Sequence, residues 1–448
     1  DGGRSQPNWI EAGDEAVQNL ANIIKIDTSS GNETKVARYI KAILDKEGIE
    51  SEILELQPGR GNLVARLQGN GTKRPVLLMG HTDVVGVQRD KWFSDPFSGE
   101  REDGFIYGRG TLDDKDNLAA ALMVIKLLKR YGVELDRDVI FLAEAGEEGT
   151  PEVGINFMVE KHYDVIEAEY ALAEGGQNIM RDDRVTQVGI ETTEKMPRRV
   201  TLVARGTPGH GSKPTLDNAV VTLANAIAKA AAWQTEVRLN DTTRTYFRRL
   251  AEVSAPEDAF RYLNVENEEF SDEIQQHFLE TFPYHYSISR TSVVPTVIDA
   301  GFRRNVIPSE ASAILDIRML PDENVEEFYA QLAAVIDDPR VEIVPERIYR
   351  PAAPPSDIDN EMFRVLENVA LRMYPEATVL PIMQTGATDM AQIRAKGVQA
   401  YGIGPARSIE EINSGYGAHG DNERVEEQAF IDMVRYMWNV VIEVAATQ

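Results

Sequence analysis

Along this chain, short apolar runs bounded by Gly or Pro alternate with longer segments whose apolar residues recur at helical spacing. The runs "RGNLVARLQG", "RPVLLMGHTDVV", "DVIFLAEA" and "YALAEGG" favour short strands. Residues 11–47 carry helical spacing, and residues 116–132 begin with acids, end with basic residues and stop at Gly132, as helices commonly do. Strands that alternate with long helices predict an α/β fold, in which helices flank a mostly parallel sheet.

The pattern changes after about residue 195 and returns to its first form at about residue 351. Between these points the sequence predicts a series of strand, helix, strand, helix and strand, over residues 199–206, 216–233, 310–320, 325–336 and 340–346. We therefore expect an inserted α+β domain at residues 196–350. The flanking residues 1–195 and 351–448 would form one discontinuous domain, with a late strand at 398–404 and a final helix from about residue 425. A length of 448 residues fits this division, because domains usually have roughly 100 to 200 residues.

The composition excludes several classes of function. A net charge of −26 argues against binding nucleic acid, which requires clustered Lys and Arg. The chain has no Cys, so disulfides, thiolate metal sites and Cys nucleophiles are excluded. No apolar run approaches the roughly 20 residues that span a bilayer. The lack of Cys and an N-terminus that looks processed favour a periplasmic or secreted protein, with a cytoplasmic one as the alternative.

Two motifs place polar residues beside predicted elements, the first at the end of a strand and the second before a helix. His81 ends the apolar run in "LLMGHTDVV", and Asp83 follows two residues later, where it could hold the second ring nitrogen of a ligating His. A hydrogen-bonded core His is the alternative. Asp113 and Asp114 lie in "YGRGTLDDKDN", directly before a predicted helix. Acids at that position are as often helix caps as functional groups.

Further acids and a second His follow the same pattern. Glu147 and Glu148 stand side by side in "AEAGEEGT", which by itself could be a solvated acidic turn, while Glu174 follows the strand in "ALAEGG". His419 precedes the last helix in "YGAHGDNERV". His and carboxylate donors without Cys suit a hard or borderline divalent ion such as zinc. The acids outnumber the needs of one tetrahedral ion, so two ions that share a carboxylate are plausible.

These segments, in this order, resemble a family of dinuclear zinc enzymes that includes aminoacylases, carboxypeptidase G, carnosinase-type dipeptidases and succinyl-diaminopimelate desuccinylase. The resemblance rests on five motifs: His-x-Asp after a strand, Gly-x-Gly-x-x-Asp-x-Lys before a helix, Glu-Glu-Gly, Glu-Gly-Gly, and a C-terminal His-Gly-Asp-Asn-Glu. It spans most of the chain. The fold that it implies is a zinc exopeptidase-like catalytic domain with an inserted lid or dimerisation domain.

The resemblance implies that Asp113 bridges two zinc ions, for which Co²⁺ or Mn²⁺ could substitute. His81 and Glu174 would complete the shell of one ion, and Glu148 and His419 that of the other. Asp113 is preferred to Asp114 because it lies two residues before Lys115, as in the family's motif. Asp114 would then be a surface or helix-start residue. The family usually has Gly after that Lys, where this chain has Asp116.

Two further residues receive catalytic roles from the resemblance. Asp83 would orient His81, and Glu147 would be the general base that removes a proton from a water bridging the metals and passes it to the leaving amine. In the inserted domain, His210 in "GTPGHGSKP" would stabilise the tetrahedral oxyanion, often in the partner subunit of a homodimer. A structural or solvent-facing His is the alternative reading for His210.

Four residues match family positions near the substrate: Asn305, Arg318, Gly386 and Asp389. Arg318 is suited to bind a carboxylate with two hydrogen bonds, but a surface or interdomain salt bridge is an equal alternative. "QTGATDM", which contains Gly386 and Asp389, could be a plain turn. We expect His162, His277 and His285, which lie outside the motifs, to be structural or exposed.

The leading hypothesis is therefore a zinc metallopeptidase or aminoacylase. Such an enzyme would hydrolyse an amide bond in an N-acyl amino acid, a dipeptide or the C-terminus of a short peptide. One rival is a noncatalytic metal- or ligand-binding protein with the same fold, and another is a hydrolase of a carbamoyl amide or ester. The long insertion around residues 235–290 resembles the branch of carboxypeptidase S and the N-fatty-acyl amino acid hydrolases. Its aromatic residues form either an apolar pocket or, as we expect, ordinary core: Tyr246, Phe247, Phe270, Phe282, Tyr284 and Tyr286.

Overall fold

The computed structural model describes residues 6–448, which divide into two compact units. Unit 1 runs to Thr192 and takes in Pro355–Ile382 and Thr388–Gln448, while unit 2 comprises Thr193–Pro354 and Met383–Ala387. From the sequence we expected the inserted domain at residues 196–350. The short return of Met383–Ala387 to unit 2 was not expected, because nothing in its composition sets it apart.

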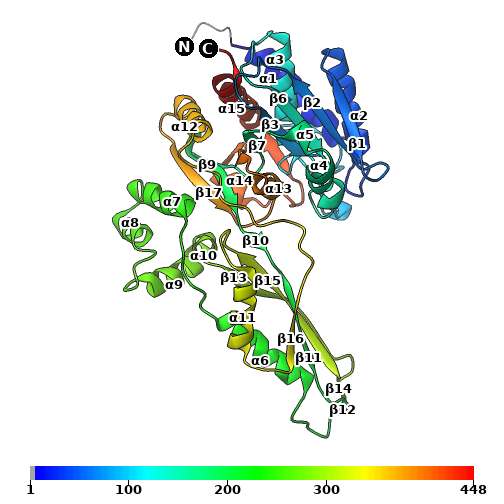
Figure 1. Cartoon of the computed structure of the whole chain (residues 1–448), viewed down its shortest axis with the longest axis vertical. Coiled ribbons are helices and arrows are strands. Elements are labelled where there is room, and N and C mark those ends of the chain that lie inside the picture. Colours follow the sequence, from blue (N-terminus) through cyan, green and yellow to red (C-terminus); the bar gives the residue numbers. More distant parts are fainter. Residues whose placement is uncertain (1–5) are drawn as a thin grey trace. The chain divides into compact units, whose positions relative to one another are not determined.

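Unit 1 is built on a large mixed sheet (Figure 1) with the strand order β1-β2-β6-β3-β7-β18-β9-β8-β19, and β17 pairs with β9. The strands are β1 (Ser51–Glu55), β2 (Gly61–Leu67), β3 (Val76–His81), β6 (Val139–Glu144), β7 (Tyr170–Ala173), β8 (Gln177–Arg181), β9 (Arg184–Glu194), β17 (Thr378–Gln384), β18 (Gln399–Gly402) and β19 (Ala406–Ser408). The central strands β6, β3, β7 and β18 are parallel, while β1, β2, β8 and β9 add antiparallel pairs at the two sides. The expected α/β fold is confirmed, with parallel pairing concentrated at the centre.

Helices cover both faces of this sheet because the central strands are apolar on both sides. In β6, Val139, Phe141 and Ala143 join one core and Ile140 and Leu142 the other. The first core takes α1 (Trp9–Ile24), α2 (Glu33–Lys46), α3 (Lys115–Arg130), α12 (Glu361–Met373) and α15 (Glu427–Ala445). The second takes α4 (Ile155–Lys161), α5 (Tyr163–Ile166) and α13 (Met390–Ala395). Successive residues of a strand point to opposite faces of the sheet, so they pack alternately against the two layers of helices.

Small elements complete unit 1 near the carboxyl end of the sheet. A three-stranded sheet joins β4 (Arg101–Glu102), β5 (Phe105–Tyr107) and β20 (Arg424–Glu426), and α14 (Ile409–Asn413) follows β19. Because β5 and β20 pair, the loop after β5 and the loop before β20 lie together, although more than 300 residues separate them.

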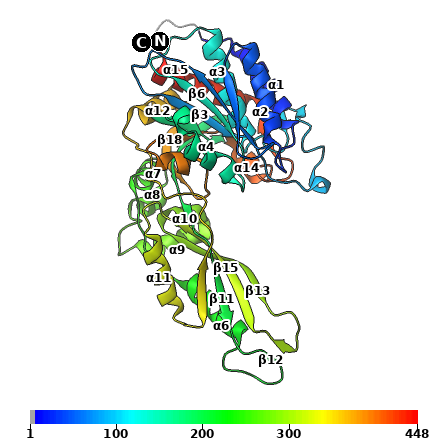
Figure 2. The same ribbon diagram turned by 45° about the vertical axis from the view of Figure 1, so that its right-hand side comes forward.

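Unit 2 has a sheet of its own. In it β15 pairs with β10, β11 and β13, and β11 also pairs with β16. Its strands are β10 (Met196–Pro197), β11 (Val200–Arg205), β13 (Ser292–Ala300), β15 (Glu310–Met319) and β16 (Val341–Pro345), and β12 (Gly209–His210) pairs separately with β14 (Val306–Ile307). The helices α6 (Ala219–Ala232) and α11 (Val325–Ile336) lie side by side against this sheet (Figure 2) and close a separate core. The α+β character expected for the insertion is present.

The polar stretch at 235–290, for which the sequence predicted no elements, forms α7 (Asp241–Glu252), α8 (Pro256–Leu263), α9 (Ser271–Thr281) and α10 (Pro283–Ser289). Tyr246 and Phe247 are buried there and pack around His285, as core residues do. Phe270 differs, because it lines a hollow of about 400 Å³ with Phe260 and Ile274. Core packing therefore accounts for Tyr246 and Phe247 but not for Phe270.

No helix within residues 6–448 combines the length and the apolar character needed to cross a membrane.

Candidate metal centre

Acidic and imidazole side chains lie at the carboxyl ends of the parallel strands of unit 1. β3 ends at His81, the loop after β6 carries Glu147 and Glu148, and Glu174 directly follows β7. Neighbouring parallel strands end at the same edge, so residues from three distant segments meet there. The sequence pattern predicted this meeting from strand ends alone.

Two loops complete the cluster. Asp113 precedes α3, and α3 packs tightly on β3 because Gly80 has no Cβ; a Cβ there would lie 3.0 Å from the backbone of Leu118. His419 comes from the loop before β20, at a backbone φ of 63°, a left-handed conformation that is uncommon for residues other than Gly. Unit 1 therefore supplies all five of the metal ligands suggested by the sequence.

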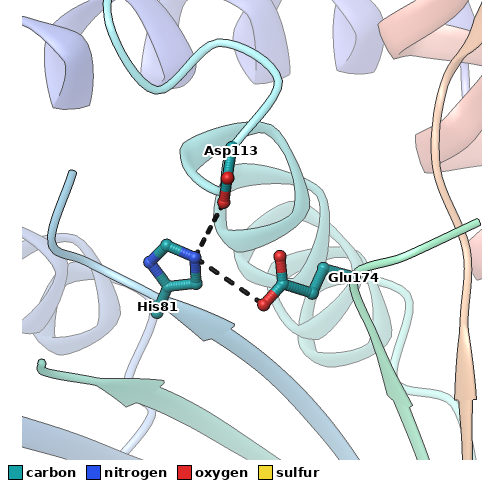
Figure 3. A group of neighbouring side chains, drawn as sticks. All are labelled: His81, Asp113 and Glu174. Carbon is teal, nitrogen blue, oxygen red and sulfur yellow. Dashed lines mark hydrogen bonds and ion pairs between the residues drawn. The ribbon is translucent and has the colours of Figure 1, made fainter. Parts of the chain in front are cut away.

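Asp113 lies at the centre of this arrangement. Its Oδ1 is 2.9 Å from Nε2 of His81, and Oε1 of Glu174 is 3.7 Å from the same nitrogen (Figure 3). Its other oxygen, Oδ2, is 2.9 Å from Nε2 of His419, which also lies 2.8 Å from Oε1 of Glu148. The two oxygens of one carboxylate thus face two different groups of donors. A carboxylate that bridges two ions needs this division.

Glu147 lies beside both groups. Its Oε2 is 3.6 Å from Nε2 of His81, and the side chain is mostly buried. Among the described residues, the donor atoms of His81, Glu147 and Glu148 also come within 4.8 Å of one another. By geometry alone Glu147 could be a ligand as well as a base.

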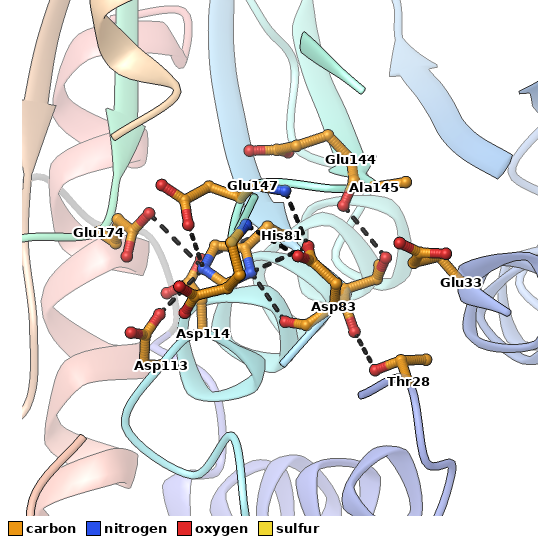
Figure 4. A network of polar contacts seen from close by, with 12 residues as sticks. Thr28, Glu33, His81, Asp83, Asp113, Asp114, Glu144, Ala145, Glu147 and Glu174 are labelled. Carbon is orange, nitrogen blue, oxygen red and sulfur yellow. Dashed lines mark hydrogen bonds and ion pairs between the residues drawn. The ribbon is translucent and has the colours of Figure 1, made fainter. Parts of the chain in front are cut away.

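Asp83 contacts both His81 and Glu147 (Figure 4), and it also holds the backbone of Glu148. Its Oδ1 accepts a hydrogen bond from the backbone N–H of Glu147 at 3.0 Å, and its Oδ2 accepts one from Glu148 at 2.9 Å. Nδ1 of His81 lies 2.9 Å from the carbonyl oxygen of Asp83 and 3.3 Å from Oδ1. Two acceptors at Nδ1 favour a proton there and leave Nε2 free to bind an ion.

The crowded carboxylates raise the pKa of both His rings. Burial alone would lower the pKa of His81, but Glu174, Asp113 and Asp83 raise it well above its ordinary value. Hydrogen bonds with Asp113 and Glu148 raise the pKa of His419 to about 10. Burial raises the pKa of Glu174 to about 7, despite the opposing effect of His81. The carboxylates of the site therefore favour a positive charge among them.

The donor set fits divalent ions. Two imidazole nitrogens and the carboxylates of Asp113, Glu148 and Glu174 are ligands that zinc, cobalt and manganese accept. Among the described residues, the groups His81, Asp113, Glu174 and Asp113, Glu148, His419 each bring one donor atom per residue within 4.8 Å of the others. Asp113 belongs to both groups, so the arrangement fits a pair of ions.

The acids beside Asp113 differ in part from the expectation for them. Asp114 precedes α3, as a helix-start residue should, but it is buried, and its Oδ2 accepts a hydrogen bond from the backbone N–H of His81 at 3.1 Å. A surface position for Asp114 is therefore wrong, because the residue supports the end of β3. Asp116, where the family usually has Gly, is also buried in the first turn of α3.

Unit 2 brings two of the remaining predicted residues together. His210 in β12 pairs with Val306 in β14, and the backbone N–H of Gly211 donates to the carbonyl of Asn305 at 2.8 Å. The backbone N–H of Ser212 donates to Nδ1 of His210 at 3.2 Å, so a neutral ring would carry its proton on Nε2. His210 is exposed, and such a ring can donate a hydrogen bond.

Arg318 makes a salt bridge, as its alternative interpretation had it, but the pair lies within unit 2 and joins no two domains. Its Nε lies 2.8 Å from Oδ1 of Asp316 in the same strand, and Arg199 also contacts Asp316. The guanidinium thus has an internal partner in unit 2.

Gly386 and Asp389, from one sequence motif, fall in different units. Gly386 lies in a bend after β17. Asp389 is 2% exposed and hydrogen-bonds the side chain of Glu144, whose backbone pairs with His81. This burial favours support of the site over direct contact with a substrate.

One acid of the C-terminal motif received no role from the sequence. Glu423 is completely buried and binds the loop that carries Asp113. Its place in "HGDNE", beside a candidate ligand, was the available signal. The partners of its carboxylate could not be read from the sequence.

Residues 77–443 match the model of peptidase family M20/M25/M40. The chain belongs to this family. The relatives of this M20 protein include a "probable carboxypeptidase S-like 2" of Dictyostelium discoideum, which is 31% identical over 70% of this chain and 62% of its own length. The human "N-fatty-acyl-amino acid synthase/hydrolase PM20D1" is 26% identical over 95% of this chain and 86% of its own length.

Among solved structures, an M20 family metallo-carboxypeptidase from Sulfolobus solfataricus matches 95% of this chain and 98% of its own. The TM-score is 0.70 at 21% sequence identity, which shows a common fold. The M20 protein is therefore a hydrolase of a metal-dependent peptidase family. The expected family and fold are confirmed.

Proposed function

We propose that this M20 protein is a zinc-dependent amide hydrolase for small substrates that bear a free carboxylate. Suitable substrates are an N-acyl amino acid, a dipeptide or the C-terminal residue of a short peptide. The observation that carries the proposal is the position of Asp113, whose two oxygens each lie 2.9 Å from a different His. The names of two relatives, a probable carboxypeptidase S-like protein and an N-fatty-acyl-amino acid synthase/hydrolase, support this class of substrate.

In this proposal Asp113 holds two zinc ions, with Co²⁺ or Mn²⁺ as substitutes. His81 and Glu174 complete one set of ligands, and Glu148 and His419 complete the other. When bound, such ions polarise a carbonyl oxygen and acidify water. The protein's own part is to fix the donors, and it does so by tying them to strand ends and to the start of α3.

Glu147 acts as general base in this proposal. It accepts a proton from the attacking water and delivers that proton to the leaving nitrogen. Its backbone is fixed by the carboxylate of Asp83, and its side chain lies beside His81. Glu147 and Glu148 are consecutive, so their side chains can point in different directions and take different roles.

Unit 2 supplies the groups that we assign to the substrate. His210 donates from Nε2 to the developing oxyanion, and Asn305, its neighbour across β12 and β14, contributes beside it. Arg318 holds the substrate carboxylate while sharing Asp316. Gly386 of unit 2 also contacts the substrate in this proposal, whereas Asp389 belongs to unit 1 and supports the metal centre through Glu144.

We also propose that the protein forms a homodimer through unit 2. β13 is an edge strand, and it exposes Val294, Val297 and Ile298. Exposed apolar edges pair readily with a second strand. The absence of Cys supports an oxidising compartment, periplasmic or extracellular.

The neighbouring acids provide the test of the catalytic assignment. In Glu147→Gln we expect both ions to be retained, while amide hydrolysis falls by about 10² to 10⁴, the usual contribution of a general base. In the matched variant Glu148→Gln we expect zinc affinity itself to fall. Metal content and hydrolysis of an N-acyl amino acid and dipeptide panel are measured on both variants.

Full activity in Glu147→Gln would overturn the assignment of the base, and so would loss of its metal. Zinc binding by the wild type without hydrolysis of any panel member would instead favour the noncatalytic binding protein. Carbamoyl amides and esters are included, and cleavage of these alone would favour the third hypothesis.

A further inference from the structure

Glu423 is an acid with no exposure to solvent and with partners on a distant loop. Its Oε2 accepts a hydrogen bond from the backbone N–H of Gly110 at 2.7 Å, and its Oε1 accepts one from Leu112 at 3.2 Å. The backbone carbonyl of Glu423 accepts a third hydrogen bond, from the N–H of Gly108 at 2.9 Å. One residue near the C-terminus therefore fixes the loop that ends at Asp113.

Arg109 completes the connection from the other side. It is 3% exposed, and its Nη1 donates to the carbonyl of Gly420 at 2.9 Å and lies 3.3 Å from the carboxylate of Glu423. Its Nη2 donates to the carbonyl of Gly86, and its guanidinium lies over the ring of Trp92. Arg109 thus binds the residue that directly follows His419.

The loop held by these contacts has a strained backbone. His419 and Asn422 have φ values of 63° and 59°, in the left-handed region. Residues other than Gly hold such conformations at a cost in energy, and they persist only where the surroundings fix them. Besides Arg109 and Glu423, the N–H of Phe93 donates to the side chain of Asn422 at 2.7 Å.

We infer that Glu423 and Arg109 are positioning residues that set the separation of Asp113 and His419, and so control the affinity of the ion that Asp113, Glu148 and His419 would hold. This inference rests on the proposed dinuclear site. We call Glu423 and Arg109 the clamp. It joins the loops of two proposed ligands, Asp113 and His419, which are more than 300 residues apart in the chain. The group formed by His81, Asp113 and Glu174 uses no residue from the loop of His419 and depends less on the clamp.

Metal ligands must be held within about 0.5 Å of their positions for tight binding, and partners behind the ligands commonly change metal affinity 10- to 100-fold when replaced. In Glu423→Gln an NH2 group replaces one of the two oxygens, so either Gly110 or Leu112 loses its acceptor, and Arg109 no longer faces a carboxylate. The two loops then separate more easily, and the strained conformation of His419 relaxes.

The test uses the full chain, stripped of metal and titrated with zinc against a chelator. Two variants weaken the clamp: Glu423→Gln removes the charge, and Arg109→Lys shortens the donor if the first variant fails to fold. The matched control is Arg137→Lys. Arg137 is equally buried and paired with Glu169 and Glu361, but it precedes β6 at the opposite end of the sheet.

In the clamp variants we expect one of the two zinc affinities, that of the ion held by Asp113, Glu148 and His419, to fall 10- to 100-fold and the other to change less. Hydrogen exchange of peptides that cover residues 105–114 should quicken in the metal-free variants, a readout independent of activity. Arg137→Lys should leave both readouts unchanged, even if it lowers the melting temperature.

Unchanged zinc affinities in both clamp variants, with two ions in the wild type, would overturn this inference alone. An equal loss in Arg137→Lys would do the same, because general destabilisation would then explain the effect. A wild type that binds fewer than two ions would instead refute the dinuclear site on which the inference rests.

Discussion

The adjacent acids Glu147 and Glu148 differ from an ordinary acidic turn in how their backbone is held. One carboxylate, that of Asp83, accepts hydrogen bonds from both of their N–H groups. Gly146, at a φ of 72°, allows the turn that brings these groups toward Asp83. Since Asp83 also faces Nδ1 of His81, a single residue aligns the proposed base and two proposed ligands. Replacement of Asp83 would therefore disturb several functions at once.

His285 is a second residue whose surroundings control its chemistry. It lies among Phe247, Phe278 and Phe282, and its Nε2 is 2.9 Å from the hydroxyl of Tyr246. Burial lowers the pKa of His285 from 6.5 to about 3. The folded protein therefore keeps this ring neutral where the unfolded chain would protonate it.

This difference gives a prediction for acid stability. The stability that His285 contributes is fully present above pH 6.5 and is lost as the pH falls toward its folded pKa of about 3, because only the unfolded chain takes up the proton. Between pH 8 and pH 5, His285→Phe should gain about 2 kcal/mol relative to the wild type, at about 1.4 kcal/mol per pH unit. Urea unfolding at the two pH values measures this.

Tyr246→Phe is the control for this experiment. It removes the hydrogen bond but keeps the buried imidazole, so its stability should follow the pH as the wild type does. A constant difference between His285→Phe and the wild type at both pH values would contradict the account of His285.

At the scale of single residues, the sequence predicted which residue types lie at the strand ends. It did not predict the hydrogen bonds and ion pairs that hold these residues in place. His81, Asp113, Glu148, Glu174 and His419 were found from motifs and strand ends, and the structure brings them together. The contacts of Glu423 and Arg109 were missed. They join residues over 300 positions apart, and no local periodicity carries that information.

At the scale of elements, regular periodicity decided what could be predicted. The strand at 138–145 and the helix at 116–132 correspond to β6 and α3, because their apolar patterns are long and continuous. The helices α7 to α10 were missed. Helical spacing becomes clear over windows of about 11 to 18 residues, and α8 and α10, with eight and seven residues, are shorter than that.

The edge strand β13 makes the proposed dimer testable. A Lys in an edge strand opposes pairing with a second strand. We expect the wild type to have twice the mass of one chain by light scattering, and Val297→Lys to have the mass of one chain. Val297 is 48% exposed, so the substitution should leave the fold intact.

Val344→Lys is the matched control for the dimer. Val344 is 39% exposed and lies on β16, at the other edge of the same sheet. Its replacement should leave the dimer intact. A monomeric wild type would contradict the proposal, and dissociation by Val344→Lys alone would place the contact on the wrong edge.

At the scale of the whole molecule, the proposed centre joins parts of the chain from His81 to His419 within unit 1. Local clustering of acids explains part of the net charge of −26, since carboxylates gather where ions would be held. The sequence indicated two domains because its periodicity changes near residues 195 and 351. The return of Met383–Ala387 to unit 2 could not be predicted, because it depends on tertiary contacts.

The most direct test of the dinuclear centre is anomalous diffraction at the zinc edge from crystals of the zinc-loaded protein. We predict two peaks per chain, with the carboxylate of Asp113 between them, one beside His81 and Glu174 and the other beside Glu148 and His419. A single peak, or two peaks that do not share Asp113, would contradict this account of the site.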